Sequence, residues 1–147
     1  MAITKWLARD QDCLVAANGS GGGFIAIGGV TAIAHTPSTT KADTTDFDDD
    51  GKPTHFVVER SDEFALSGHN LMDVTDGTRD PGQAEVELLA EKMGIDSLGL
   101  FQIMDPAGFP IQFYASVEVV LPSGGNNDIA AWSAKLTVSG HISRPTP

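Results

Sequence analysis

The final third of the chain shows the clearest alternation of apolar and polar side chains. Between residues 111 and 121 every odd position is apolar, as at Phe113, while polar side chains such as Glu118 occupy positions between them. This period of two is that of a strand with one buried face. Residues 98–104 and 129–142 are also rich in apolar side chains and are bounded by turn-forming motifs. The pattern therefore predicts three strands in this part of the chain.

Shorter apolar runs in the first half predict further strands. Residues 12–17 and 24–27 flank a glycine-rich turn, which favours a β-hairpin, and residues 30–35 follow a Gly-Gly pair that marks a bend. Residues 56–67 alternate again, so one face of this strand is expected to pack against the core. Its predicted packing side chains are Phe56, Val58, Phe64 and Leu66.

One helix is predicted, over about residues 81–93. Asp80 is a suitable N-cap and Pro81 suits the first helical position, while Gln83 completes a capping-box pattern. Gly94 supplies the stop signal. The expected apolar face repeats with helical spacing and consists of Val86, Leu89, Ala90 and Met93.

Residues 36–55 lack the large apolar side chains of the other segments, with Phe47 as the exception. The segment is rich in Thr, Ser and Asp and includes Pro37 and Pro53. It is predicted to be a long acidic loop of about twenty residues, a length that is uncommon in compact domains unless the loop is functional or mobile.

Together these segments predict a mainly β fold. Seven or eight strands with one flanking helix suit a β-sandwich or a small barrel. The chain has 147 residues, and it shows neither an internal repeat nor a linker. Residues 1–147 are therefore expected to form a single domain with its own core.

Charge adds information about partners. Twenty acidic against nine basic side chains leave a formal net charge of −11. Proteins that hold duplex DNA or anionic membranes use Lys and Arg, so this chain is expected neither to bind DNA specifically nor to bind a membrane. The excess of acidic over basic side chains is concentrated in residues 43–63, which contain eight acidic and two basic side chains.

The acidic segment contains half of a calcium-binding motif. Residues 46–51 read DFDDDG, and acids at positions 1, 3 and 5 with glycine at position 6 can wrap oxygens around a hard cation. Position 12 is Val57 instead of the bidentate Glu, and no helix is predicted before the loop. A solvated or contact-making acidic loop is favoured, with calcium binding as the alternative.

Motifs for catalysis are missing from the sequence. The four histidines lack zinc-site spacing, there is no Gly-x-Ser-x-Gly elbow, and the glycine runs lack the context of a phosphate loop. Cys13 is the single cysteine, so no disulfide can form within the chain, and it is expected to be a buried small hydrophobe. We therefore expect no enzyme activity, no cofactor and no metal.

Five short motifs occur along most of the chain in a fixed order. They are TTDFDDDG at residues 44–51, RSDEFALSG at 60–68, DPGQA at 80–84, DPAG at 105–108 and AWSAKLTVSG at 131–140. In order and spacing the series resembles the major tail (tail tube) proteins of long, non-contractile bacteriophage tails.

The resemblance implies a β-sandwich subunit that forms hexameric rings, which stack into a hollow tube that conducts DNA. It implies partners as well: other copies of the chain, and the tape-measure, terminator and distal tail proteins. The expected location is the virion tail, assembled in the host cytoplasm. In such families the long loop after the early strands reaches neighbouring subunits or the next ring. Inter-subunit contact is thereby assigned to Asp46, Phe47, Asp48, Asp49 and Asp50.

The acidic charge has a physical rationale in such a tube. A lumen lined with carboxylates repels the phosphate backbone, so DNA can slide without sticking. The candidate lumen-facing side chains are Glu59, Ser61, Glu63 and Glu118. The same alternation would arise if these side chains met bulk solvent, and the sequence leaves both interpretations open.

Two other functions are compatible with the sequence. The first is a different ring-forming component of a virion or secretion tube, such as a tail terminator, a decoration protein or an effector tube. The second is a soluble β module whose acidic loop holds calcium. Tubes or rings in electron micrographs would favour an assembling protein, whereas a monomer stabilised by calcium would favour the binding module.

Overall fold

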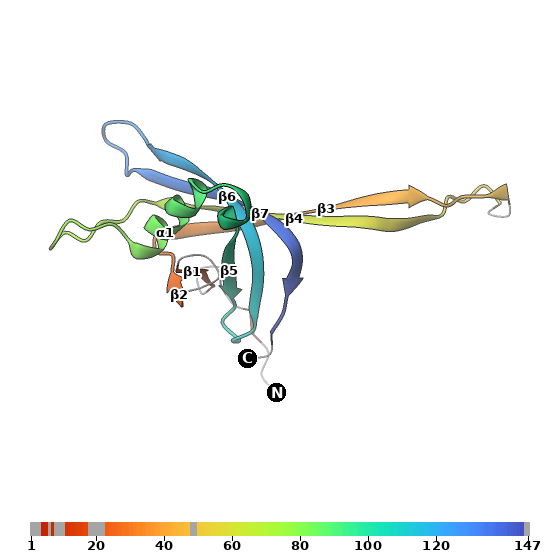
Figure 1. Cartoon of the computed structure of the whole chain (residues 1–147), viewed down its shortest axis with the longest axis horizontal. Helices are drawn as coiled ribbons and strands as arrows, with labels where there is room; N and C mark the ends of the chain where they lie inside the picture. The colour runs from red at the N-terminus through yellow and green to blue at the C-terminus, as the bar shows by residue number, and fades with distance from the viewer. Residues whose placement is uncertain (1–3, 6, 8–10, 18–22, 48–49, 146–147) are drawn as a thin grey trace.

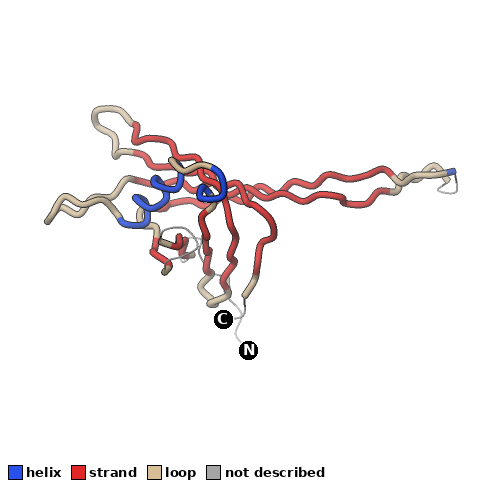
Figure 2. The backbone as a smooth tube through the Cα atoms, viewed as in Figure 1, coloured by secondary structure: helices blue, strands red, loops and turns tan. Residues whose placement is uncertain are grey.

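The computed structural model describes residues 4–5, 7, 11–17, 23–47 and 50–145. The elements in chain order are β1 (Asp12–Ala16), β2 (Phe24–Ala26), β3 (Val30–Asp43), β4 (His55–His69), α1 (Pro81–Ala90), the short 3-10 helix η4 (Gly94–Ser97), β5 (Gly99–Met104), β6 (Pro110–Ser123) and β7 (Ala131–Ser143). The seven described strands form one antiparallel sheet in the order β2-β1-β5-β6-β7-β4-β3 (Figures 1 and 2). The predicted mainly β fold with one flanking helix is confirmed.

The hydrophobic core lies between one face of the sheet and α1, which contacts β1, β2 and β6. Phe113 of β6 and Leu136 of β7 are almost inaccessible to solvent, as the alternation of apolar residues predicted. Val86 and Leu89 of α1 are equally buried and belong to the same core cluster. Burial of each such side chain contributes about 1.5–3 kcal/mol, so this packing stabilises the contact between the sheet and the helix.

The helix is shorter than predicted. The Asp80 cap is confirmed, because its Oδ2 accepts a hydrogen bond from the Gln83 backbone N–H at 3.1 Å. The helix ends at Ala90 and not at residue 93. Met93 has an extended backbone (φ −129°, ψ 159°) and is 87% exposed, so its predicted place on the apolar face is wrong. Gly94, at φ 67°, is the first residue of η4.

Gln83 does not complete the predicted capping box. Its side chain is fully buried, where Nε2 donates to the carbonyl oxygens of Gly28 and His69, both at 2.8 Å. Its Oε1 accepts from the Leu71 N–H at 3.2 Å. The side chain therefore joins the start of α1 to the β2–β3 turn and to the end of β4, which explains its burial.

The predicted long loop at residues 36–55 is too long, because residues 36–43 and residue 55 are strand. β3 continues to Asp43 and β4 begins at His55, so the loop is confined to residues 44–54. Threonine favours extended backbone, and Pro37 is tolerated because β3 is the edge strand of the sheet. This pair of strands is exposed on both faces and therefore lacks the apolar alternation by which a strand is recognised.

Candidate functional site

β3 and β4 leave the sheet together as a two-stranded arm, here defined as residues 37–62 (Figure 1). β4 pairs with β7 only over residues 63–69. Beyond them, seven residue pairs join β3 to β4 alone, from Pro37 opposite Asp62 to Asp43 opposite His55. At the usual rise per residue this paired part reaches about 20 Å beyond the sheet.

The arm exposes apolar side chains and strand edges. Phe56 is 70% exposed, Val58 is 63% exposed, and Phe47 at the tip is fully exposed. Of the packing face predicted for residues 56–67, only Phe64 and Leu66 are buried. Strand edges and apolar side chains in such a projection are available for pairing and packing with another chain.

The tip of the arm is closed by polar contacts. The Thr44 N–H donates to the Thr54 carbonyl oxygen at 2.9 Å, and the Thr45 N–H donates to Asp43 Oδ1 at 2.9 Å. Hydrogen bonding from Thr45 lowers the pKa of Asp43, first through its side chain and then through its backbone, which keeps this carboxyl ionised. Asp43 is thus a fixed negative charge beside the tip.

The residues predicted for inter-subunit contact lie at this tip. Asp46, Phe47 and Asp50 are all exposed, and Asp50 adopts a positive φ of 48°. Asp48 and Asp49 lie outside the described residues. The structure therefore places three of the five predicted contact residues at the end of the arm farthest from the core (Figure 2).

The arm is anchored where it leaves the sheet. His35 Nε2 lies 2.7 Å from Asp62 Oδ1, across the hairpin. The His35 ring stacks on Phe64 with centroids 4.7 Å apart, and Phe64 stacks in turn on Phe113 at 4.7 Å. Sequence reasoning missed His35 and Asp62 as a pair, because only the register between β3 and β4 shows that they meet.

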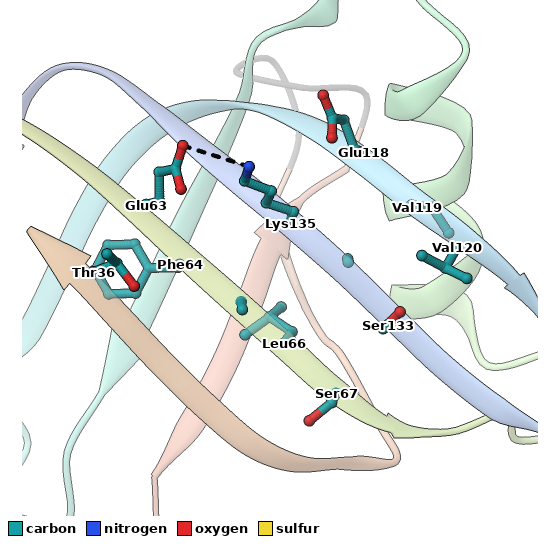
Figure 3. A pocket seen from close by; sticks show the side chains of 12 residues that line it. Thr36, Glu63, Phe64, Leu66, Ser67, Glu118, Val119, Val120, Ser133 and Lys135 are labelled. Carbon is teal, nitrogen blue, oxygen red and sulfur yellow. Dashed lines mark ion pairs between the residues drawn. The ribbon is translucent and has the colours of Figure 1, made fainter.

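The face of the sheet opposite the core carries mostly small side chains. We call it the small-residue face, and over β3, β4, β6 and β7 it includes Thr36, Ala65, Ser67, Glu118, Val120 and Ser133. A shallow hollow of about 470 Å³ lies here (Figure 3). Small side chains leave the backbone of this face close to the surface.

The four predicted lumen residues share this face. Glu63 and Glu118 both line the hollow. Glu59 and Ser61 continue the same parity along β4, outward onto the arm, and line a cleft of about 670 Å³ between the arm and the end of β7. The structure therefore places Glu63 and Glu118 at the same hollow, on the strands either side of β7, and leaves Glu59 and Ser61 farther out.

Lys135 is a residue of this face that sequence reasoning did not single out. It lies on β7, between β4 and β6, and its Nζ is 3.6 Å from Glu63 Oε1 (Figure 3). In the β6–β7 register Lys135 stands opposite Glu118. Its position in the alternation of β7 could have indicated the face, but not which carboxylates lie beside it.

Other chemistry is sparse in the part of the chain that the structure describes. No three His, Cys, Asp or Glu side chains group there as a metal site. No described helix is long and apolar enough to cross a membrane. Cys13 is buried as predicted, and burial raises the pKa of its thiol to about 12. The thiol is therefore protonated at neutral pH.

Comparison with known proteins identifies the fold. Neither a protein-family model nor a curated protein matches the sequence. A chain in the tail of an empty gene transfer agent (GTA) particle, refined with helical C6 symmetry, superposes with a TM-score of 0.75 and 18% identity, covering 97% of this chain and 100% of the other. A chain of the native GTA virion gives a TM-score of 0.68 and 17% identity, with the same coverage of 97% and 100%.

A third solved structure has a different place in its particle. A chain from the sixfold-symmetrised baseplate of the anti-feeding prophage (AFP) gives a TM-score of 0.60 and 8% identity, covering 98% of this chain and 97% of the other. At these identities the likeness defines the fold. The fold is thus of a class found in tail and baseplate chains of phage-like particles.

Proposed function

We propose that this chain is a structural subunit of a phage-type tail tube, in which hexameric rings stack around a channel for DNA. The observation that carries the proposal is the likeness to the GTA tail chain, which extends over 97% of this chain and all of that one. That particle was refined with C6 symmetry, and the proposed ring takes its sixfold order from it. The ordered sequence motifs resemble the same kind of protein.

The arm supplies the contact between copies in this proposal. Its exposed Phe56 and Val58, with the strand edges beside them, offer apolar area and backbone groups that a neighbouring subunit can cover. The arm projects from one end of the molecule, and its contact with a different surface of a second copy would be heterologous (Figure 1). Heterologous contacts build rings when they close and extended stacks when they do not.

The small-residue face lines the channel in this proposal. It is the sheet face that does not pack on α1, and it carries Glu63 and Glu118 among small side chains. Carboxylates on the channel wall repel phosphates, so DNA passes without being held. Glu59 and Ser61 extend the same face toward the arm.

The proposal also fixes where the protein works. As a tube subunit it contacts other copies of itself and, at the ends of the tube, the tape-measure, terminator and distal tail proteins. It belongs to the virion tail and assembles in the host cytoplasm. It acts without catalysis, a cofactor or a metal.

A second candidate is another ring-forming component of the tail or of a related secretion tube. The AFP baseplate chain favours it, because 98% of this chain superposes on a chain from a baseplate structure. A ring component at the end of a tube would form rings that do not stack without limit.

Electron microscopy of the purified full-length chain tests the proposal. We expect hollow tubes with regularly stacked rings as the protein concentration rises. Isolated rings that never stack would favour the second candidate. A monomer at every concentration would contradict both, and stabilisation of that monomer by calcium would point to a calcium-binding module.

A further inference from the structure

Lys135 stands between two carboxylates on the small-residue face. It lies on β7, with Glu63 on β4 to one side and Glu118 on β6 to the other (Figure 3). Its Nζ is 3.6 Å from Glu63 Oε1, and the strand register places it opposite Glu118. Of the described residues that line the hollow, Lys135 is the only Lys or Arg, and Glu63 and Glu118 are the only acids.

The stability of the sheet does not require this arrangement. The side chains of Lys135 and Glu63 are 51% and 44% exposed, and a pair in such a position contributes little to folding because water and salt screen it. The backbone ladder and the core on the other face already fix the register of β4, β6 and β7. The three charges therefore matter mainly to whatever faces them.

We propose that Glu63 and Glu118 mask Lys135, so that the small-residue face presents no free cation to duplex DNA moving past it. This inference rests on the proposed function, because it needs the face to line a channel. The lysine forms an ion pair with Glu63 on β4, Glu118 stands opposite it on β6, and the local charge of the three groups stays negative. Removal of both carboxylates leaves one unmasked cation on each subunit.

Repetition makes one lysine per subunit significant. In stacked hexameric rings the same position recurs six times in every ring, so a DNA segment would meet several unmasked lysines at once. Contacts with about six to ten phosphates lose about 10³-fold or more in affinity between about 50 and 200 mM salt. DNA held by Lys135 should show this steep dependence on salt.

The experiment measures the retention of a short fluorescent duplex DNA by sedimented tubes of the full-length chain, over a series of salt concentrations. The test variant is Glu63→Gln/Glu118→Gln, and the triple variant adds Lys135→Gln. Glu91→Gln/Asp96→Asn is the charge-matched control, since these two acids are exposed near the end of α1 and in η4. Circular dichroism and unfolding midpoints verify that each variant folds, which near-isosteric changes at exposed positions should permit.

We expect the double variant to retain at least about tenfold more DNA than wild type at about 50 mM salt and to release it by about 200 mM. The triple variant and the charge-matched control should behave as wild type. The masking role is overturned if the double variant retains no more DNA than wild type. It is also overturned if the triple variant or the charge-matched control retains as much DNA as the double variant. Failure of the wild-type chain to form tubes instead contradicts the proposed function, and the inference then falls with it.

Discussion

At the scale of single residues, Gly68 marks a close approach of two backbones. A Cβ at this position would overlap the carbonyl oxygen of Gly29, which itself has φ 75° in the β2–β3 turn. We expect Gly68→Ala to lower the free energy of unfolding by about 1–3 kcal/mol, because the backbone must shift. Gly23→Ala is the control, since nothing lies near a Cβ there. Urea unfolding compares the two, and equal stability would contradict the close approach.

Gln83 is a second residue with a measurable structural role. Its side chain satisfies the carbonyl oxygens of Gly28 and His69 and the N–H of Leu71. Gln83→Ala leaves these groups without their partner and should cost about 2–4 kcal/mol of stability. Leu88→Ala on the exposed side of the same helix should cost about 0.5 kcal/mol or less. A small loss for both variants in thermal or urea unfolding would be inconsistent with the buried network.

Cys13 offers a chemical test of burial. Because its pKa is raised to about 12, less than a thousandth of the folded protein carries the reactive thiolate at pH 8. A maleimide or disulfide reagent should modify the thiol rapidly in urea and very slowly in the native chain. The raised pKa also means that stability is fully present below the pKa of the unfolded thiol, about 8.5, and declines as the pH rises toward 12. Rapid labelling of folded protein would show that Cys13 is accessible.

Residues that act through neighbours on other strands could not be identified from the sequence. Helix capping by Asp80 was predictable because the cap and the group it satisfies are three residues apart. Gln83 also has a local explanation in the sequence, the capping box, and the structure replaces it with contacts 12 or more residues away. Lys135 and Glu63 meet only through the pairing of β4 with β7.

At the scale of elements, the arm shows the limit of reading strands from hydrophobic alternation. That alternation arises because one face of a strand packs on a core, and it located β5, β6 and β7. Residues 37–43 pack on nothing in the described chain, so their composition is that of a loop although their backbone is paired. The sequence indicated the acidic tip correctly as an exposed segment, but not the paired strands that carry it.

Shortening the tip tests whether the arm connects subunits. Deletion of residues 46–51 leaves the hydrogen bond between Thr44 and Thr54 that closes the stem. We expect a monomer whose unfolding midpoint is nearly unchanged, because the core lies at the other end of the arm. Tubes should be absent from electron micrographs of this variant. Tubes of unaltered length and number would contradict the role of the tip.

Two further variants separate charge from apolar contact in the arm. Phe56→Ser removes an exposed aromatic ring without disturbing the core, so the free energy of unfolding should change by about 0.5 kcal/mol or less. The protein concentration needed for assembly should rise about tenfold, as expected when a contact of about 1.4 kcal/mol is lost. Asp46→Asn/Asp50→Asn keeps the shape of the tip and tests its charge. Light scattering measured against protein concentration gives the assembly concentration of each variant. An unchanged assembly concentration for Phe56→Ser would exclude packing by this ring.

At the scale of the whole molecule, acidic side chains are concentrated along the arm. The acids concentrated in residues 43–63 follow the arm from its tip to the sheet, where Glu63 reaches the small-residue face. The opposite face is closed by α1 over the core. The mainly β composition and the single helix followed from periodicity, whereas the direction of the arm and the separation of the two faces required the pairing order of the sheet.

A cryo-electron microscopy reconstruction of tubes assembled from the purified chain tests the central claim most directly. The account predicts rings of six subunits, with the arm of each subunit in contact with another copy and with Ser67, Lys135 and Glu118 facing the bore. Tubes in which α1 lines the bore, or a chain that remains monomeric at every concentration, would contradict it.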